Sequence, residues 1–294
     1  MARRREVGKP SRGVVAVGGL SINGRRSVIA GAAPPADGSA LRTAIGAWLV
    51  GVEAAVCAVI DPAFPTDVIL DITRAGIDLS RLRPRSAADL GTDVNGDPTP
   101  AQLASLSARW SVHVCPMAHP HQRDMVRALR QRAAMVTLDA PGASGASPAD
   151  ADDVLALAAT CDAFLPSVND VSKLWPGQAP RELLRVIAGR GVPATVIRQG
   201  VGGSIGIHDG VITWVPAFPV TASGVTAGGD AYAGAFAAVF ASGRDLPRAM
   251  AWATAAASTV VESFATLDPL SEFGRSQVEH RARILEADAR VRDA

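Results

Sequence analysis

Short apolar runs alternate with helical patterns along most of this chain, and that alternation limits the folds that it can adopt. The runs are apolar at consecutive positions, as in residues 13–19 (GVVAVGG) and 54–60 (AAVCAVI). Such runs are typical of strands in a sheet that is covered on both faces. Helices between the strands then require right-handed crossovers between parallel neighbours. The sequence predicts an α/β fold with a doubly wound, mostly parallel sheet flanked by helices on both faces.

The other elements are predicted from the same patterns. We expect further strands at residues 111–116, 134–139, 163–166, 194–198, 204–208 and 211–215, the last two joined as a hairpin through Asp209-Gly210. We expect helices near residues 39–50, 66–75, 100–109, 121–132, 149–160 and 180–190, and a nearly all-helical last third at about 230–263 and 275–291. Residues 1–12 are predicted to be a disordered basic tail, and residues 13–294 a single domain.

Composition excludes several classes of function. The 294 residues carry a net charge of +1, which gives no general attraction to nucleic acid or to an anionic membrane. No apolar run reaches the roughly 18–20 residues that span a bilayer, so we expect a cytoplasmic protein. Cys57, Cys115 and Cys161 lack metal-ligand spacing and are predicted to be buried, reduced thiols. The pattern G-x-x-x-x-G-K-[ST] does not occur in the sequence, which excludes a Walker-type NTPase.

The segment TAGGDAYAGAF, residues 226–236, places two glycines and a carboxylate at the start of a helix of small residues. Backbone N–H groups at a helix start have no intrahelical partner, and the helix dipole adds partial positive charge. Gly228 and Gly229 would let a phosphate approach those groups. Asp230 would repel a phosphate, but it suits a base that takes a proton from a hydroxyl attacking phosphorus. A tight turn followed by a helix-stabilising acid explains the segment equally well when it is taken alone.

The position of this segment among the other loops favours the chemical interpretation. Ligands bind to a doubly wound sheet outside the carboxyl ends of its strands. The loops at those ends hold Asp61-Pro62, Asp139, Pro166-Ser167 and residues 198–203 (RQGVGG). We therefore expect the chemistry at this edge of the sheet, and the reaction that the sequence favours is phosphoryl transfer to an alcohol.

Taken in order, these loops resemble those of the ribokinase/PfkB family of small-molecule kinases, over about residues 14–265. The family signature D-T-x-G-A-G-D-x-F aligns with residues 224–232 (GVTAGGDAY), and P-N-x-x-E aligns with residues 166–170 (PSVND). The nucleotide-loop pattern T-x-G-x-x-G aligns with residues 198–203, and G-D-x-F-G is echoed by residues 60–65 (IDPAFP). The resemblance implies a ribokinase-like fold and an ATP-dependent kinase with Mg²⁺ as cofactor. Its acceptor would be a small alcohol such as a sugar or a nucleoside.

The resemblance also implies roles for individual residues. It makes Asp230 the catalytic base and the backbone of Ala227, Gly228 and Gly229 the anion hole. Nucleotide binding would fall to Arg198, Gly200, Gly203, Thr226 and Thr254, and acceptor binding to Asn23, Gly38 and Arg42; Asp170 would help indirectly to organise the metal. Alternatives stay open at three of these places. Gly200 and Gly203 also fit a plain turn, Asp170 an ordinary helix cap, and Thr254 simple helix packing.

The chain departs from the family pattern where the acceptor and the anion are bound. Gly224-Val225 stands in place of Asp-Thr, Ala227 in place of the first anion-hole glycine, and residues 37–42 (DGSALR) in place of G-G-x-x-x-N. Only about twenty residues separate Gly18 from Gly38, so we expect a β lid that is small or absent. A ribokinase-like protein that binds a nucleotide or metabolite without turnover is therefore the alternative function. The oligomeric state also stays open, and a homodimer is one form that it could take.

Overall fold

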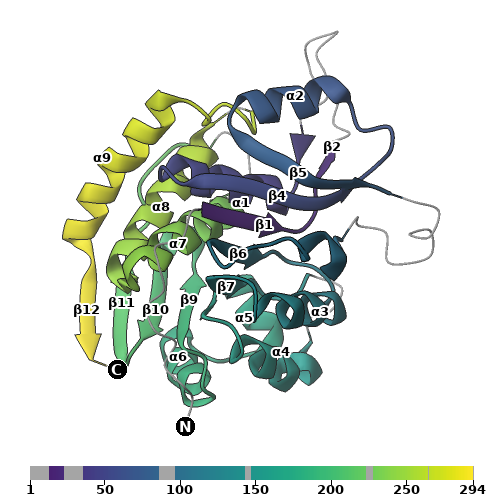
Figure 1. Cartoon of the computed structure of the whole chain (residues 1–294). Coiled ribbons are helices and arrows are strands. Elements are labelled where there is room, and N and C mark those ends of the chain that lie inside the picture. Colours follow the sequence, from purple (N-terminus) through teal and green to yellow (C-terminus); the bar gives the residue numbers. More distant parts are fainter. Residues whose placement is uncertain are drawn as a thin grey trace.

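The computed structural model describes residues 13–22, 36–85, 97–142, 147–222, 228–263 and 265–293. Within these residues, ten strands form one sheet of order β12-β11-β10-β9-β8-β7-β6-β1-β4-β5 (Figure 1). The strands from β9 to β5 in this order are parallel, and β10, β11 and β12 continue the sheet with antiparallel pairings. The strands are β1 (Gly13–Val17), β4 (Glu53–Ile60), β5 (Ile77–Pro84), β6 (Trp110–Val114), β7 (Met135–Leu138), β8 (Ala163–Phe164), β9 (Ala194–Arg198), β10 (Ser204–His208), β11 (Val211–Val215) and β12 (Arg290–Asp293).

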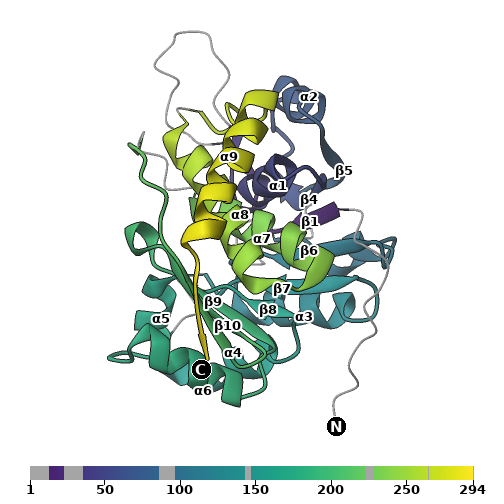
Figure 2. The same ribbon diagram turned by 90° about the vertical axis from the view of Figure 1, so that its left-hand side faces the viewer.

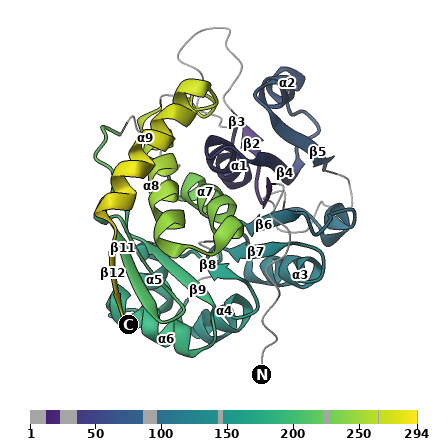
Figure 3. The same cartoon turned by 60° about the vertical axis from the view of Figure 1, so that its left-hand side comes forward.

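Helices cover both faces of this sheet (Figures 1 and 3). Successive residues of β1 point to opposite sides: Val14 and Ala16 join one core, while Val15 and Val17 join the other. The first core is closed by α1 (Ser39–Leu49), α2 (Thr66–Arg74), α7 (Gly228–Gly243), α8 (Leu246–Glu262) and α9 (Glu272–Asp288). The second core is closed by α3 (His119–Leu129), α4 (Ala151–Ala158), α5 (Val168–Leu174) and α6 (Pro180–Gly189). The predicted doubly wound, mostly parallel sheet with helices on both faces is confirmed.

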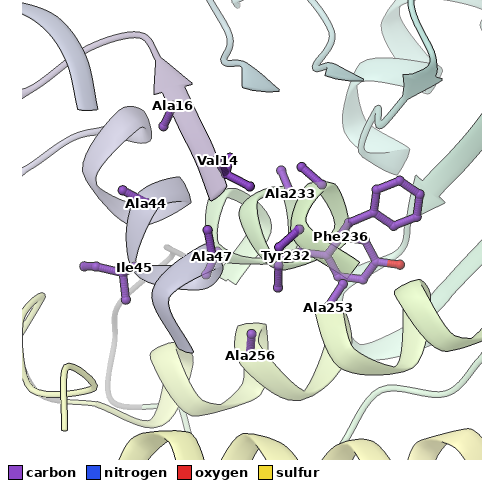
Figure 4. Packing of buried hydrophobic residues seen from close by; sticks show 14 of the residues in the cluster. Val14, Ala16, Ala44, Ile45, Ala47, Tyr232, Ala233, Phe236, Ala253 and Ala256 are labelled. Carbon is purple, nitrogen blue, oxygen red and sulfur yellow. The ribbon is translucent and has the colours of Figure 1, made fainter. Parts of the chain in front are cut away.

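Helices α1 and α7 approach each other closely because glycines lie at their contact. A Cβ atom on Gly46 of α1 would lie 2.0 Å from the backbone oxygen of Ala231, and one on Gly234 of α7 would lie 1.8 Å from that of Thr43. The surrounding layer consists mainly of alanine side chains from α1, α7 and α8, packed beside β1 (Figure 4). Small residues therefore let the backbones of α1 and α7 meet where the two helices cross.

Helix starts and ends follow local signals in the sequence. The Asp245 carboxylate caps α8 by accepting from the Arg248 N–H at 3.1 Å, and the Ser271 hydroxyl caps α9 by accepting from the Gly274 N–H at 3.1 Å. Helix α9 crosses the outside of α8 and leads directly into β12 (Figure 2). At the start of α8 and of α9, the N-cap side chain thus satisfies an otherwise unpaired N–H group.

The structure differs from the predicted elements at residues 77–84, at residues 100–109 and near residue 290. Residues 100–109 do not form an α-helix: a 3₁₀ turn, Pro100–Leu103, is closed by a capping box between Thr99 and Gln102. Residues 77–84 form the edge strand β5, which its charged residues Asp78, Arg81 and Arg83 conceal in the sequence. The last helix ends at Asp288 rather than near residue 291, because Arg290–Asp293 pairs with β11 instead.

The expected lid is indeed small in the part of the chain that the structure describes. Strands β2 (Ser21–Ile22) and β3 (Ala36–Asp37) pair as a two-stranded antiparallel ribbon beside the main sheet. The residues between them, 23–35, lie outside the described residues, as does the predicted tail, 1–12. Among the described helices, none combines the length and the apolar character needed to cross a membrane.

Candidate active site

The start of α7 lies against the carboxyl ends of strands in the parallel part of the sheet. Asp230 is in the first turn of this helix. Arg198, the last residue of β9, donates from Nη1 to the backbone oxygen of Gly229 in the same turn. Its other nitrogen, Nη2, donates to a carboxylate oxygen of Asp139, which directly follows β7. One arginine therefore ties the start of α7 to two strand ends, at the edge where α/β sheets bind their ligands.

A second arginine approaches Asp230 from α1. The Arg42 Nη1 atom lies 3.5 Å from Oδ2 of Asp230, and the Arg42 Nη2 atom donates to the Asp37 carboxylate at 2.6 Å. Asp37 ends β3, and its Oδ1 atom also accepts from the Gly38 N–H at 2.8 Å. The side chains of Arg42, Asp37 and Asp230 are each 18% exposed. Helices α1 and α7 and strand β3 thus bring one arginine and two carboxylates to one partly exposed place.

A buried polar cluster lies behind this place. Asp139 is almost fully buried, and its second oxygen lies 3.5 Å from Nε2 of the buried His113 on β6. The other ring nitrogen of His113 lies 2.9 Å from the Thr137 hydroxyl. Buried charge is tolerated only when it is paired, and Arg198 supplies the pairing for Asp139. This cluster fixes a negative charge inside the protein, close to the start of α7.

The surroundings of Asp230 make it a stronger base than an ordinary aspartate. Burial raises the pKa of the Asp230 carboxyl from 3.8 to about 6, and the charge of Asp139 adds to the rise. The positive charges of Arg198 and Arg42 act in the opposite direction and offset part of it. A carboxylate whose pKa lies near neutral pH is suited to general base catalysis, because it is still ionised at pH 7 and accepts a proton more readily.

Comparison with known proteins identifies the family. The model of the pfkB family carbohydrate kinases matches residues 87–272, well over half of the chain. This chain belongs to the pfkB family. No curated protein sequence matches this chain. The matched range includes Arg198 and Asp230.

Solved structures agree with this assignment at the level of the fold. Aminoimidazole riboside kinase from Salmonella enterica, complexed with aminoimidazole riboside and an ATP analogue, has 16% identity and a TM-score of 0.72, covering 92% of the pfkB chain and 99% of its own. Fructokinase from Vibrio cholerae, with fructose, ADP and a calcium ion, has 14% identity and a TM-score of 0.71, covering 90% and 98%. A protein from E. coli assigned as ribokinase II, in complex with ATP and Mg²⁺, has 16% identity and a TM-score of 0.70, covering 92% and 99%.

The glycines of the predicted nucleotide loop have backbone reasons to be glycine. Gly200 has φ +57° and Gly203 has φ +81°, a region that residues with a Cβ atom rarely adopt. A Cβ atom on Gly203 would also lie 2.2 Å from the backbone oxygen of Val215. Between them, the Val201 side chain is fully exposed. The loop therefore presents backbone and one apolar side chain to solvent, and its contact with a nucleotide stays a prediction.

Arg198, Asp170 and Thr254 all have partners within the protein. Both terminal nitrogens of Arg198 bind Asp139 and Gly229. Asp170 forms a capping box: its Oδ2 atom accepts from the Ser167 N–H at 2.8 Å and from the Ser167 hydroxyl at 2.6 Å. Thr254 is buried in α8, and its hydroxyl donates to the Met250 backbone oxygen at 2.9 Å. Their predicted roles toward nucleotide and metal stay predictions.

The remaining predicted residues divide into two groups. Arg42 lies 3.5 Å from Asp230, Gly38 is the N-cap residue of α1, and Gly228 and Gly229 form the first turn before Asp230. Their roles toward the acceptor and the anion stay predictions. A Cβ atom on Gly229 would lie 3.2 Å from Arg198 Nη1, so this glycine makes room for the arginine. Asn23, Thr226 and Ala227 lie outside the described residues.

The sequence did not single out Asp37, Asp139 or His113 as members of the site. Asp139 had one visible signal, since it follows a predicted strand at the edge where ligands bind. Asp37 stands five positions before Arg42, directly ahead of a predicted helix. This spacing was the available signal for the ion pair between Asp37 and Arg42. His113 carried no signal, because one polar residue within a buried strand is most often there for packing.

Proposed function

We propose that this pfkB chain is an ATP-dependent phosphotransferase that phosphorylates a hydroxyl group of a small metabolite, with Asp230 as general base. The observation that carries the proposal is the Asp230 carboxyl itself. It lies in the first turn of α7, partly exposed, with its pKa raised to about 6. A sugar, a nucleoside or a related alcohol is the acceptor class that we propose, because the neighbouring structures hold aminoimidazole riboside or fructose.

In the proposed reaction, the acceptor hydroxyl gives its proton to Asp230 while its oxygen forms a bond to the γ-phosphorus of ATP. The bond between that phosphorus and the ADP oxygen breaks in the same step, and ADP leaves with those electrons. The backbone N–H groups at residues 227–230 and the dipole of α7 would stabilise negative charge on the transferring group. Each exposed helix-terminus contact contributes only about 0.3–1 kcal/mol, so several must act together.

Magnesium would enter with the nucleotide. Among the described residues, no three His, Cys, Asp or Glu side chains gather where they could hold an ion. We propose that phosphate oxygens and water provide most of the ligands, as is common for Mg²⁺, and that Asp170 orients water from its place at the start of α5. The ion would supply charge neutralisation between the phosphates of ATP.

The test is ADP release with ATP and Mg²⁺ across pooled sugars, nucleosides and vitamin-like alcohols. We expect turnover with at least one pool, and the variant Asp230→Asn should lower kcat by about a hundredfold or more because the general base is lost. The matched control is Asp124→Asn, an exposed acid on α3, which should leave kcat unchanged. Equal turnover by Asp230→Asn and wild type on the same acceptor would eliminate the mechanism. Nucleotide binding without turnover of any acceptor would favour the non-catalytic alternative.

A further inference from the structure

Arg42 lies between two carboxylates, and it is held much more closely by one of them. Its Nη2 atom is 2.5 Å from Oδ1 of Asp37 and 2.6 Å from Oδ2 of the same residue. Its Nη1 atom is 3.5 Å from Asp230, at the outer limit of a hydrogen bond. Charge-assisted contacts shorter than about 2.9 Å are the strong ones. Asp37 is therefore the principal partner of Arg42, and Asp230 a distant second.

If Asp37 did not hold Arg42, the guanidinium group would be free to pair with Asp230. A guanidinium group frequently forms two parallel hydrogen bonds with a free carboxylate. Such a pair would occupy the oxygen atoms of Asp230 and favour its ionised form. We propose that Asp37 is a positioning residue that holds the Arg42 guanidinium away from Asp230 and so leaves that carboxylate open to the acceptor hydroxyl. This inference rests on the proposed function, because it assumes that Asp230 must accept a proton.

Asp37 is itself fixed in place. Its Oδ1 atom accepts from the Gly38 N–H at 2.8 Å. Gly38 has φ +132°, and a Cβ atom there would lie 2.4 Å from the Gly19 backbone oxygen, so the turn that orients Asp37 requires glycine. The backbone oxygen of Gly38 then accepts the first helical hydrogen bond of α1, from Arg42, at 3.1 Å. The acid and the arginine are thus held at a set separation by one helix start.

The same arrangement occurs on the other side of Asp230. Arg198 also lies close enough to favour the ionised form of Asp230, yet its two terminal nitrogens are bound to Asp139 and to the Gly229 backbone oxygen. Cys115, a further titratable neighbour among the described residues, is buried, and burial raises the pKa of its thiol, so it stays neutral. Two arginines approach the base, and each is held by a different acid.

The experiment measures the titration of Asp230 directly. Aspartate labelled with ¹³C at its carboxyl carbon gives one NMR signal per residue, and Asp230→Asn identifies the signal of interest. In wild type we expect a titration midpoint near 6. In Asp37→Ala, Arg42 is released onto Asp230, and the midpoint should fall by about one pH unit or more. The acid limb of the kcat/KM profile should move to lower pH by the same amount. The value of kcat at pH 8 should drop by about fivefold or more, because a weaker base accepts the proton less readily.

Two further variants separate positioning from folding. Asp37→Glu keeps the carboxylate and should keep the midpoint close to that of wild type. The double variant Asp37→Ala with Arg42→Met removes the released guanidinium, so the midpoint should return to 6 or higher. An unchanged midpoint in Asp37→Ala, or a midpoint that stays low in the double variant, would overturn the inference.

A matched ion pair provides the control. Arg244 follows α7 at its opposite end and donates to Asp162 at 2.8 Å. Asp162→Asn should leave the Asp230 midpoint unchanged, because the two sites are separated by the length of the helix. A shift of that midpoint would count against a local effect of Asp37 on Arg42. The NMR signal also separates the two proposals. If wild type turns over no acceptor while Asp37→Ala still lowers the Asp230 midpoint, the proposed function is contradicted, but the role of Asp37 in holding Arg42 is supported.

Discussion

At the scale of single residues, the surroundings of Asp230 make the folded protein less stable when Asp230 is ionised, and the same surroundings make Asp230 a stronger base. A carboxylate in water ionises fully at pH 7, whereas Asp230 is ionised in a partly buried place beside the like charge of Asp139. The two arginines offset only part of that cost. Strained or charged groups of this kind persist when the surrounding fold holds them, and they are common where proteins bind or react.

This cost predicts a more stable protein when Asp230 is neutral. The pKa of Asp230 is higher in the folded state than its ordinary value of 3.8, so folded protein binds the proton more tightly. The contribution of Asp230 to the free energy of unfolding therefore falls as pH rises from about 4 to about 6, and the loss is complete above that range. Asp230→Asn should raise the free energy of unfolding at pH 7.5 by about 1–3 kcal/mol.

Urea unfolding of wild type and Asp230→Asn at pH 4 and pH 7.5 measures this difference. The two proteins should differ at pH 7.5 and converge at pH 4, where the aspartate is protonated in the folded state. Asp124→Asn, on the exposed face of α3, should change stability by less than about 0.5 kcal/mol at either pH. An equal gain for Asp230→Asn at both values would show that ionisation is not its source.

At the scale of elements, the distance between α1 and α7 decides whether the site assembles. Arg42 belongs to one of these helices and Asp230 to the other, and 188 positions separate them in the chain. Only the missing side chains of Gly46 and Gly234 allow the backbones to meet. A change at this crossing, remote from the chemistry, should therefore alter the contact between Arg42 and Asp230.

Gly234→Ala should separate the two helices and weaken the fold. The added Cβ atom would lie 1.8 Å from the Thr43 backbone oxygen, which cannot move freely because it belongs to α1. We expect a loss of about 1–3 kcal/mol, typical of overpacking, in thermal or urea unfolding. Gly243→Ala at the end of the same helix meets nothing within 4 Å and should be neutral or stabilising. Similar losses in both variants would point to helix propensity rather than to the crossing.

At the scale of the whole molecule, the alternation of strands and helices was predictable because burial on both faces gives strands an unmistakable apolar pattern. Strand β1 and helix α1 were predicted to within two residues. Strand β5 was not predicted, because an edge strand carries charges such as Arg81 that hide the pattern. Asp230 and its glycines were singled out from the local spacing of the segment together with its position among the loops at the carboxyl ends of the strands. The pairing of Arg198 with Asp139 could not be, since 59 positions separate them and only the finished sheet brings β7 and β9 together.

Nucleotide binding should stabilise the molecule as a whole. A ligand that binds only the folded state adds about 2.7 kcal/mol when its concentration is a hundred times its Kd. We expect ATP or ADP with Mg²⁺ to raise Tm by several degrees, and Asp230→Asn to show the same rise because the acid serves the acceptor. Adenosine without phosphates should give a much smaller shift. Equal shifts with adenosine and ATP would contradict phosphate binding at α7, and no shift with any nucleotide would remove ATP as the cofactor.

One face of the sheet is closed by helices that the ribosome makes late. Strand β1 ends at residue 17, whereas α7, which packs against it with α1, begins at residue 228. At about 5–20 residues per second, more than ten seconds pass between the two. Over that interval, of the described helices that close this core, α1 and α2 are the ones already made. Newly made chains should therefore depend on chaperones until the final quarter emerges, and truncated products should aggregate readily.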